Sequence, residues 1–208
     1  MDSFLLPAIS VAGEAKPSEA TPTHGTSMFE TILRGLALND KESAVRILPV
    51  DVYGNNSMSS TFDVANGIYQ AINAGANTVN LSLGSGGDSE FLHNVIKNGA
   101  AQHILFFAAA GNEPTTAPSY PAAYPEVMAV TAGTKDGSIA SYANRGDFVD
   151  LVAPGSGMVV FNGQSWLIMG TSASTAYVSG LAAGIVDVNK MTPEQVTVAL
   201  QKLLPVKK

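Results

Sequence analysis

Cysteine is absent from this sequence of 208 residues, which excludes disulfide bonds, thiolate metal sites and a cysteine nucleophile. Charge is scarce as well, since only 13% of the residues are charged, the net charge is −6 and no basic run is present. Because nucleic-acid binding depends on clustered Lys and Arg, we expect no nucleic-acid partner. No apolar run approaches the roughly 18 residues that span a bilayer, so we expect no membrane partner either.

The N-terminus also lacks the basic segment and apolar core that together mark a secretory signal. Its apolar stretch, residues 4–12, is short and is broken by Pro7. As written, the chain is therefore expected either to be cytoplasmic or to follow an export segment that lies upstream.

Hydrophobic residues make up 46% of the chain, which favours a deeply buried core over disorder. From residue 44 onward, apolar strand-like runs alternate with segments that have helical spacing. This alternation predicts a three-layer α/β/α fold with a mostly parallel twisted sheet. The expected strands are residues 44–52, 78–83, 103–110, 127–134 and 148–152, with a hairpin over 157–161 and 165–169; the expected helices are 26–38, 61–74, 89–101, 171–189 and one that begins at Thr192.

Residues 1–23 precede this pattern as an irregular N-terminal segment. Their prolines, glycine, serines and threonines predict that residues 7–23 form a loop rather than a strand. The sequence contains no internal repeat and no linker, so residues 1–208 are expected to form a single domain.

Three residues that could take part in catalysis lie where a loop or strand meets a helix or turn. Such places often carry function in α/β folds. Ser172 stands just inside the helix 171–189, where unpaired backbone N–H groups favour an oxyanion. His24 precedes a helix and is a candidate general base. Asn112 follows the strand 103–110 and is a candidate oxyanion donor. Taken alone, each has a plainer interpretation: a helix N-cap at Thr171 or Ser172, a surface histidine, and a turn asparagine.

In combination, these segments make the sequence similar to the subtilisin-like serine protease family, the subtilases. The family's HGT, AAGN and GTS signatures occur in the family's order as His24-Gly25-Thr26, Ala109-Ala110-Gly111-Asn112 and Gly170-Thr171-Ser172. Residues 44–54, 80–84, 120–130 and 151–155 also resemble blocks of the family. The resemblance therefore extends from His24 to the C-terminus.

The resemblance implies a serine endopeptidase that hydrolyses polypeptides and is secreted or held in the cell envelope. Ser172 would attack the peptide carbonyl, His24 would take its proton, and Asn112 with the backbone N–H of Ser172 would hold the oxyanion. The resemblance also implies two sets of substrate-binding residues. The substrate would pair as an added strand with Ser82, Leu83 and Gly84. The first specificity pocket would be lined by Ala109, Gly111 and Ser119, with residues 57–60 on the opposite rim.

The third triad member is the point where the sequence departs from the family. The family places an Asp at the end of a buried first strand, in an Asp-Ser/Thr-Gly turn. Here only Asp2-Ser3-Phe4 is available, without a strand before it or a glycine after it. Either Asp2 is the triad Asp, or it is an ordinary terminal residue and the first strand is truncated or missing. In the second case an upstream peptide or a second chain could supply both the strand and the Asp.

The insertion that forms a calcium loop in many relatives is absent, because residues 38–43 run almost directly into the next strand. The Asp and Glu residues are scattered without calcium-loop spacing. We therefore expect no cofactor and no required metal, although the resemblance leaves a structural calcium open.

Two other functions compete with proteolysis. One is a catalytically impaired or inactive member of the fold, kept for binding, which the missing Asp turn favours. The other is a nucleotide-binding domain, because Gly84-Ser85-Gly86-Gly87 follows a strand and precedes a helix. Ser89 occupies the third glycine position of that motif, and no acidic residue follows at the spacing that would hold a ribose. The sequence therefore disfavours nucleotide binding.

Overall fold

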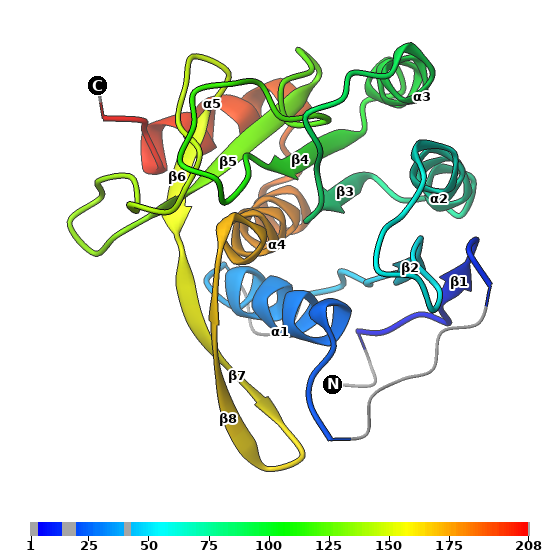
Figure 1. The fold of residues 1–208 in the computed structure, drawn as a ribbon, viewed down its shortest axis with the longest axis horizontal. Helices are drawn as coiled ribbons and strands as arrows, with labels where there is room; N and C mark the ends of the chain where they lie inside the picture. Colours follow the sequence, from blue (N-terminus) through cyan, green and yellow to red (C-terminus); the bar gives the residue numbers. More distant parts are fainter. Residues whose placement is uncertain (1–3, 14–19, 40–42, 208) are drawn as a thin grey trace.

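The computed structural model describes residues 4–13, 20–39 and 43–207. Its centre is a parallel sheet of four strands in the order β3-β4-β5-β6 (Figure 1). These strands are Thr78–Leu81, Leu105–Ala109, Val127–Gly133 and Leu151–Pro154. Strand β4 is buried along its whole length, which is why its apolar residues run continuously instead of alternating with polar ones.

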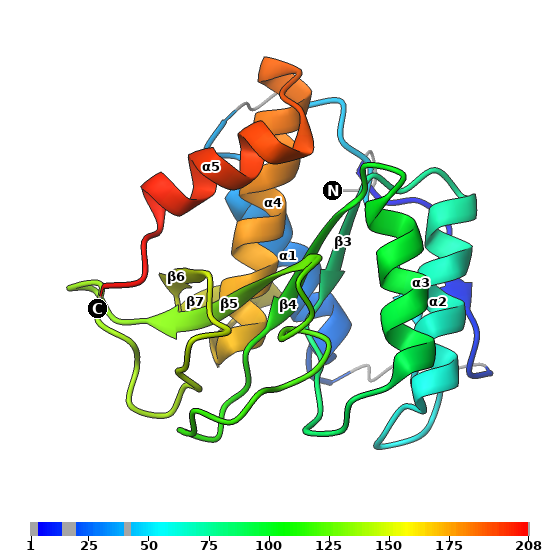
Figure 2. The ribbon, with the colours of Figure 1, turned by 90° about the horizontal axis from the view of Figure 1, so that it is seen from above.

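Helices cover both faces of this sheet, which confirms the expected three-layer α/β/α fold (Figure 2). On one face, α2 (Thr61–Asn73) and α3 (Glu90–Ala100) share an apolar cluster with Phe106. On the other face, α4 (Thr171–Asn189) and α5 (Pro193–Leu203) pack around Phe107. Among the described residues, no helix combines the length and the hydropathy needed to cross a bilayer.

Helix α1 (His24–Leu36) packs against α4 so closely that the two backbones touch. A Cβ on Gly35 would collide with the carbonyl oxygen of Tyr177, and a Cβ on Gly180 would collide with that of Ile32. Only glycine allows this approach, because it has no Cβ. As a result, the N-terminal ends of α1 and α4 lie at the same edge of the molecule as the carboxyl ends of β3 and β4 (Figure 2).

A second parallel sheet is made by two short strands near the N-terminus. They are β1 (Ile9–Ser10) and β2 (Val50–Asp51). The N–H of Ile9 donates to the carbonyl of Pro49, and that of Val11 donates to the carbonyl of Asp51, both at 3.0 Å. Strand β1 follows Asp2 in the chain and lies outside the central sheet, so it is not the strand that the family places before its triad Asp; the described residues contain no such strand.

Two expectations about these segments are corrected. The prediction of a loop throughout residues 7–23 is wrong at β1, because pairing with a distant segment makes a strand that the local composition does not indicate. The expected strand over residues 44–52 narrows to β2 and a single bridge between Leu5 and Ile47. Pro49 has no N–H, so it cannot continue the ladder.

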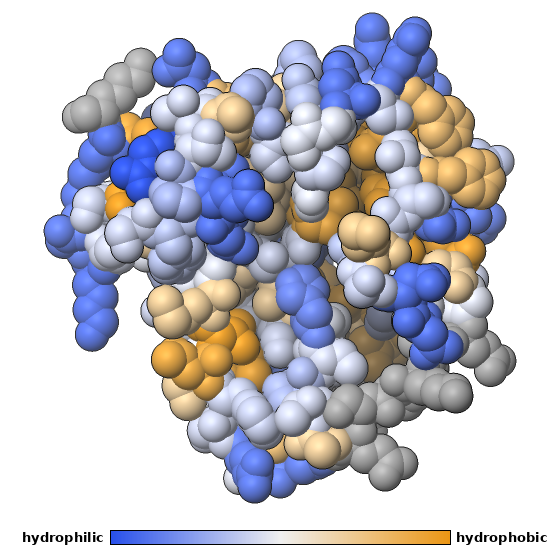
Figure 3. Space-filling view, in the orientation of Figure 1, coloured by the Kyte–Doolittle hydropathy of each residue, from blue (hydrophilic) through white to orange (hydrophobic). Residues whose placement is uncertain are grey.

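The predicted hairpin is confirmed as β7 (Ser156–Phe161) and β8 (Gln164–Met169), joined by a turn at Asn162 and Gly163. Both turn residues have positive φ, as the tightest hairpin turns require. The hairpin projects from the body of the molecule (Figure 1), and Figure 3 shows apolar surface on it. The apolar residues exposed on the hairpin are Met158, Val160, Leu167 and Met169.

Candidate active site

Ser172 is the second residue of α4 and is half buried. The residue that caps this helix is Gly170, whose φ of 137° lies in a region that favours glycine. Gly170 has no side chain with which to make a capping hydrogen bond. The interpretation of Thr171 or Ser172 as an ordinary N-cap is therefore wrong, and the Ser172 hydroxyl has no capping role.

Ser172 is tied to the segment that follows β3 by two contacts with Ser82. The Ser172 Oγ donates toward the carbonyl oxygen of Ser82 at 3.4 Å, and the Ser82 Oγ donates to the carbonyl oxygen of Ser172 at 3.0 Å. The Ser82 Oγ also accepts from Nδ2 of Asn80 at 3.0 Å. The fold thus brings one of the expected substrate-binding residues against the candidate nucleophile.

Asn112 is held at the N-terminus of α4 by its neighbour Thr171. Its Oδ1 accepts from the backbone N–H of Thr171 at 2.9 Å and from the Thr171 Oγ1 at 3.1 Å. The carbonyl end of the side chain is fully engaged, which leaves the Nδ2 amide as a donor. Among the described residues, neither this Nδ2 nor the backbone N–H of Ser172 has an acceptor. Two open N–H donors therefore lie at the first turn of α4.

His24 is the first residue of α1, directly after the N-cap Thr23, whose Oγ1 accepts from the N–H of Thr26 at 3.1 Å. The helix begins two residues before the expected start, so His24 lies within its first turn. His24 is exposed to solvent, yet nearby protein atoms partly desolvate its charged form and lower the pKa of His24 below the ordinary 6.5. The ring is therefore neutral, and able to accept a proton, at neutral pH.

The packing of α1 on α4 brings the end of α1 that holds His24 to the same edge as the end of α4 that holds Ser172. One turn after His24, Met28 packs against Ala173, the residue that follows Ser172. Within the described part of the chain, no hydrogen bond joins His24 to Ser172 and no carboxylate binds His24. Such catalytic bonds are often long before substrate binds. Asp2, the candidate third triad member, lies outside the described residues.

Two of the expected substrate-binding residues face each other across a narrow space. The buried Ser119 Oγ would lie only 3.0 Å from a Cβ placed on Gly84. The segments are held together next to this point, because Ser85 and Tyr120 exchange backbone hydrogen bonds of 2.9 and 2.7 Å. Gly84 and Ser119 are therefore too close together for a side chain to enter between them.

The remaining expected residues lie around the same strand ends. Ala109 is the last residue of β4 and is buried, and Leu83 packs against the cluster beneath α2 and α3. The N–H of Gly111 donates to the Thr171 Oγ1 at 3.2 Å. Gly111 thus contacts the residue that orients Asn112.

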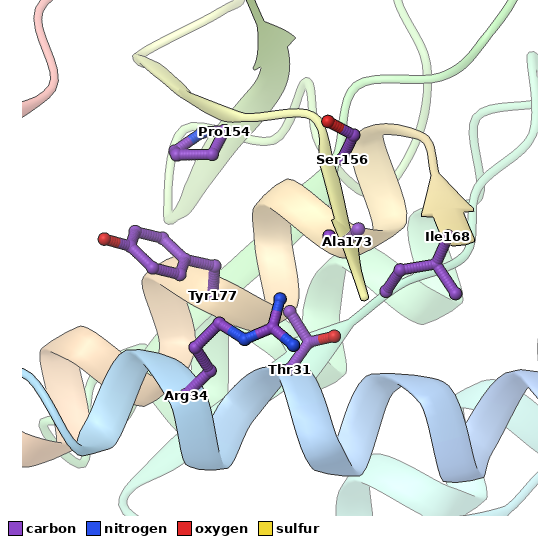
Figure 4. Close-up of a pocket in the computed structure, with 8 residues that line it drawn as sticks. Thr31, Arg34, Pro154, Ser156, Ile168, Ala173 and Tyr177 are labelled. Carbon is purple, nitrogen blue, oxygen red and sulfur yellow. The ribbon is translucent and has the colours of Figure 1, made fainter. Parts of the chain in front are cut away.

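The recess drawn in Figure 4 is separate from these residues. It encloses about 60 Å³ between α1, α4 and the β7–β8 hairpin, with Arg34 and Tyr177 on its walls. A volume of this size holds a few water molecules. It is therefore too small to accept a peptide side chain together with its backbone.

Metal ligands are not gathered anywhere in the described part of the chain. No group of three or more His, Asp or Glu side chains there is placed to hold a metal ion. The expectation of no cofactor and no required metal stays a prediction.

Two residues that support the site were not foreseen from the sequence. Thr171 orients Asn112, and its place in the GTS signature is the one signal that could have pointed to it. The buried Asn144 accepts from the N–H of Glu113 through Oδ1 at 2.8 Å, and its own N–H donates to the carbonyl of Gly111 at 3.0 Å. Asn144 fixes both neighbours of Asn112, but nothing in the sequence marks it.

The fold and the site define a class: a three-layer α/β protein with a serine and a histidine on adjacent helices, at the carboxyl ends of parallel strands. The sequence model of the Subtilase family matches residues 4–204. The chain therefore belongs to the subtilase family, and the resemblance drawn from its signatures is confirmed.

Individual relatives agree with this assignment. The thermostable alkaline protease of Halalkalibacterium halodurans is 33% identical over 191 residues, which are 85% of this chain and 52% of that protein. The solved protease domain of PatA has a TM-score of 0.80 at 26% identity, covering 97% of this chain and 80% of that one. A cold adapted subtilisin-like serine proteinase has a TM-score of 0.77 at 30% identity, covering 93% and 74%. The chain spans about half the length of the curated relatives it matches.

Proposed function

We propose that this chain is the catalytic core of a serine endopeptidase, with Ser172 as nucleophile and His24 as general base. The observation that carries the proposal is the pair of open donors at the first turn of α4, Nδ2 of Asn112 and the backbone N–H of Ser172. Two N–H groups beside a serine hydroxyl are what a tetrahedral oxyanion requires. On family membership alone, we also propose that the protein acts outside the cytoplasm.

In the proposed mechanism, the Ser172 Oγ attacks the scissile carbonyl carbon while a ring nitrogen of His24 takes the hydroxyl proton. The carbonyl oxygen becomes an oxyanion and accepts from Asn112 and from the Ser172 N–H. The imidazolium then gives its proton to the leaving amine, and an acyl-enzyme forms. Water repeats the sequence and releases the acid. The lowered pKa of His24 keeps the base neutral at the start of each cycle.

The substrate is proposed to lie along residues 82–84 as an added strand. Ser82 already contacts Ser172, so a peptide paired there would present its carbonyl to the nucleophile. The side chain that precedes the scissile bond would then lie against Gly84 and Ser119, which are too close together to form a deep pocket. A small residue, such as alanine, is therefore the proposed preference.

One observation favours a second candidate, a catalytically impaired subtilase kept for binding. No described carboxylate binds His24, and a catalytic imidazole is normally oriented by an acidic partner. The two candidates differ in the reactivity of Ser172, which is therefore the property to measure.

The test is to treat the purified protein with a fluorophosphonate probe and to locate the adduct by mass spectrometry. Ser172→Ala serves as the control, and circular dichroism establishes that both proteins are folded. An adduct on Ser172 supports the proposed enzyme. A folded protein that is not labelled would contradict it and favour the binding candidate.

A further inference from the structure

Strand β3 and helix α4 meet through polar side chains, although the rest of the layer between α4 and the sheet is largely apolar. Successive side chains of a strand point to opposite faces of the sheet. Leu81 belongs to the cluster beneath α2 and α3, so its neighbours Asn80 and Ser82 point the other way, toward α4. There they contact Ser179 and Ser172, which are two helical turns apart and therefore lie on the same side of α4. Two polar contacts thus join the strand to the helix.

The hydrogen bonds among these side chains form a chain with a defined direction. The Oγ of the buried Ser179 donates to Oδ1 of Asn80 at 3.1 Å and to the carbonyl oxygen of Thr175 at 2.9 Å. Nδ2 of Asn80 donates to the Ser82 Oγ at 3.0 Å. Because an amide nitrogen only donates, the Ser82 Oγ must accept this bond, and its single hydrogen is left for the carbonyl oxygen of Ser172 at 3.0 Å. The orientation of the Asn80 amide therefore decides where the Ser82 hydroxyl points.

This chain ends on the backbone of the proposed nucleophile. The Ser172 Oγ in turn donates toward the carbonyl oxygen of Ser82 at 3.4 Å, so the first turn of α4 is bound to the segment 82–84 in both directions. Apolar contacts have no direction and would not fix the helix along the sheet in this way. A displacement of about 1 Å between reacting groups can lower a rate about 10²-fold, so a directed bond at this place bears on the reaction.

We propose that Asn80 is a positioning residue for the reaction assigned to Ser172. It acts through the Ser82 hydroxyl, which it directs onto the carbonyl oxygen of Ser172. It thereby fixes the distance between the proposed nucleophile and the segment along which the substrate is proposed to lie. The effect on hydrolysis rests on the proposed function; the direction of the Ser82 hydroxyl does not.

Two substitutions of Asn80 distinguish this role from simple packing. Asn80→Asp keeps the shape but replaces the Nδ2 donor by an acceptor oxygen, so the hydrogen of Ser82 should turn toward residue 80 and away from Ser172. Asn80→Ala removes the amide but leaves that hydrogen free to stay on Ser172. At about pH 8, where a carboxyl group is ionised, kcat for a chromogenic peptide should fall about tenfold in the aspartate variant and about threefold in the alanine variant.

Packing alone predicts the opposite order, because aspartate fills the space of asparagine and alanine leaves a cavity. KM should stay nearly unchanged in both variants, since the substrate is proposed to pair with the backbone of residues 82–84 and not with Asn80. Asn77→Asp is the matched control. Asn77 directly precedes β3 and is exposed, so the same charge is added without contact to Ser82, and kcat should match that of the parent protein.

The variant Ser82→Ala tests whether Asn80 acts through the Ser82 hydroxyl. In a protein that already lacks this hydroxyl, Asn80→Asp should cause no further loss of kcat, because residues that act as one unit are not additive. Additive losses would show that Asn80 acts by another route and would overturn the proposal.

The direction of the Ser82 hydroxyl can also be measured without activity. The ¹³C chemical shift of the Ser172 carbonyl depends on the hydrogen bonds that this carbonyl accepts, and NMR measures it directly. The resonance should move in the same direction in Asn80→Asp and in Ser82→Ala, and it should keep its position in Asn77→Asp.

The outcomes separate positioning from the proposed function. A moved carbonyl resonance together with the expected order of kcat values supports the proposal. A moved resonance in a folded parent protein that the fluorophosphonate does not label supports the directed bond and counts against the proposed protease. A resonance that keeps its position in Asn80→Asp overturns the proposal. In an active protein, an unchanged kcat in Asn80→Asp, or a larger loss in the alanine variant, also overturns it.

Discussion

The side-chain carbonyl oxygen of Asn112 accepts two hydrogen bonds from Thr171, at 2.9 Å from the backbone N–H and at 3.1 Å from Oγ1. Rotation of the amide by half a turn would lose both bonds, so the Nδ2 group is kept as the outward donor. Thr171 in turn precedes Ser172 in the first turn of α4. The proposed nucleophile and the proposed oxyanion donor are thereby aligned by one residue, Thr171.

Replacing Asn112 by alanine should lower kcat for peptide hydrolysis by about 10²–10³-fold, the range known for the loss of one oxyanion donor in subtilisins. KM should change little, because the amide acts on the oxyanion and not on the bound peptide. Steady-state kinetics with a chromogenic peptide measures both constants. An unchanged kcat in a folded variant would remove Asn112 from the oxyanion site.

Thr171→Val should cause a smaller loss, about tenfold in kcat, because one of the two bonds that orient Asn112 remains. The conservative change Thr171→Ser keeps the hydroxyl and should restore most of the rate. If Thr171 had a purely structural role, the valine variant would instead have a lower melting temperature, and the serine variant would not differ from it in kcat. Kinetics and thermal melting of both variants distinguish the two roles.

The labelling rate of Ser172 should fall on acidification with a midpoint below pH 6.5. Only the neutral imidazole accepts a proton, and desolvation lowers the pKa of His24, so the active form persists to lower pH than for a free histidine. A series of fluorophosphonate rates between about pH 5 and 8 gives the midpoint. A midpoint above 6.5 would show that His24 is not the titrating base, or that a bound anion raises its pKa.

Ser119→Gly should widen the space opposite Gly84 and shift the preference at the cleavage site toward larger side chains. The Ser119 Oγ lies where it limits the room beside Gly84. The ratio of kcat/KM for a phenylalanine peptide over an alanine peptide should rise about tenfold, the usual effect of about 1–3 kcal/mol in a hydrophobic pocket. An unchanged ratio would mean that the side chain is bound elsewhere.

Gly180→Ala should reduce the free energy of unfolding by about 1–3 kcal/mol, because the added methyl group forces α4 away from the backbone of α1. Gly86→Ala is the matched control, since a Cβ there meets no atom within 4 Å. Urea titrations followed by circular dichroism give both values. Equal stability of the two variants would show that the helices separate without cost.

The parts of the fold that depend on local pattern were predictable. Helix α4 was expected over residues 171–189 and spans them, because a continuous apolar run begins directly after a glycine. Strand β1 was missed, since its two residues become a strand only by pairing with residues 49–51. The positions of Ser172 and Asn112 followed from the signatures, but the role of Thr171 did not. It depends on a contact between side chains that are remote in sequence.

The contact at Gly35 and Gly180 also determines how this protein should lose its structure and the proposed activity on heating. His24 and Ser172 each lie in a helix, and the two helices are in contact backbone to backbone, so no loop sets the separation of these two residues. Thermal inactivation is then expected to coincide with the loss of helical signal, without an earlier stage in which the folded protein is inactive. The melting curve of α1 and α4 would then give the temperature range over which the proposed enzyme works.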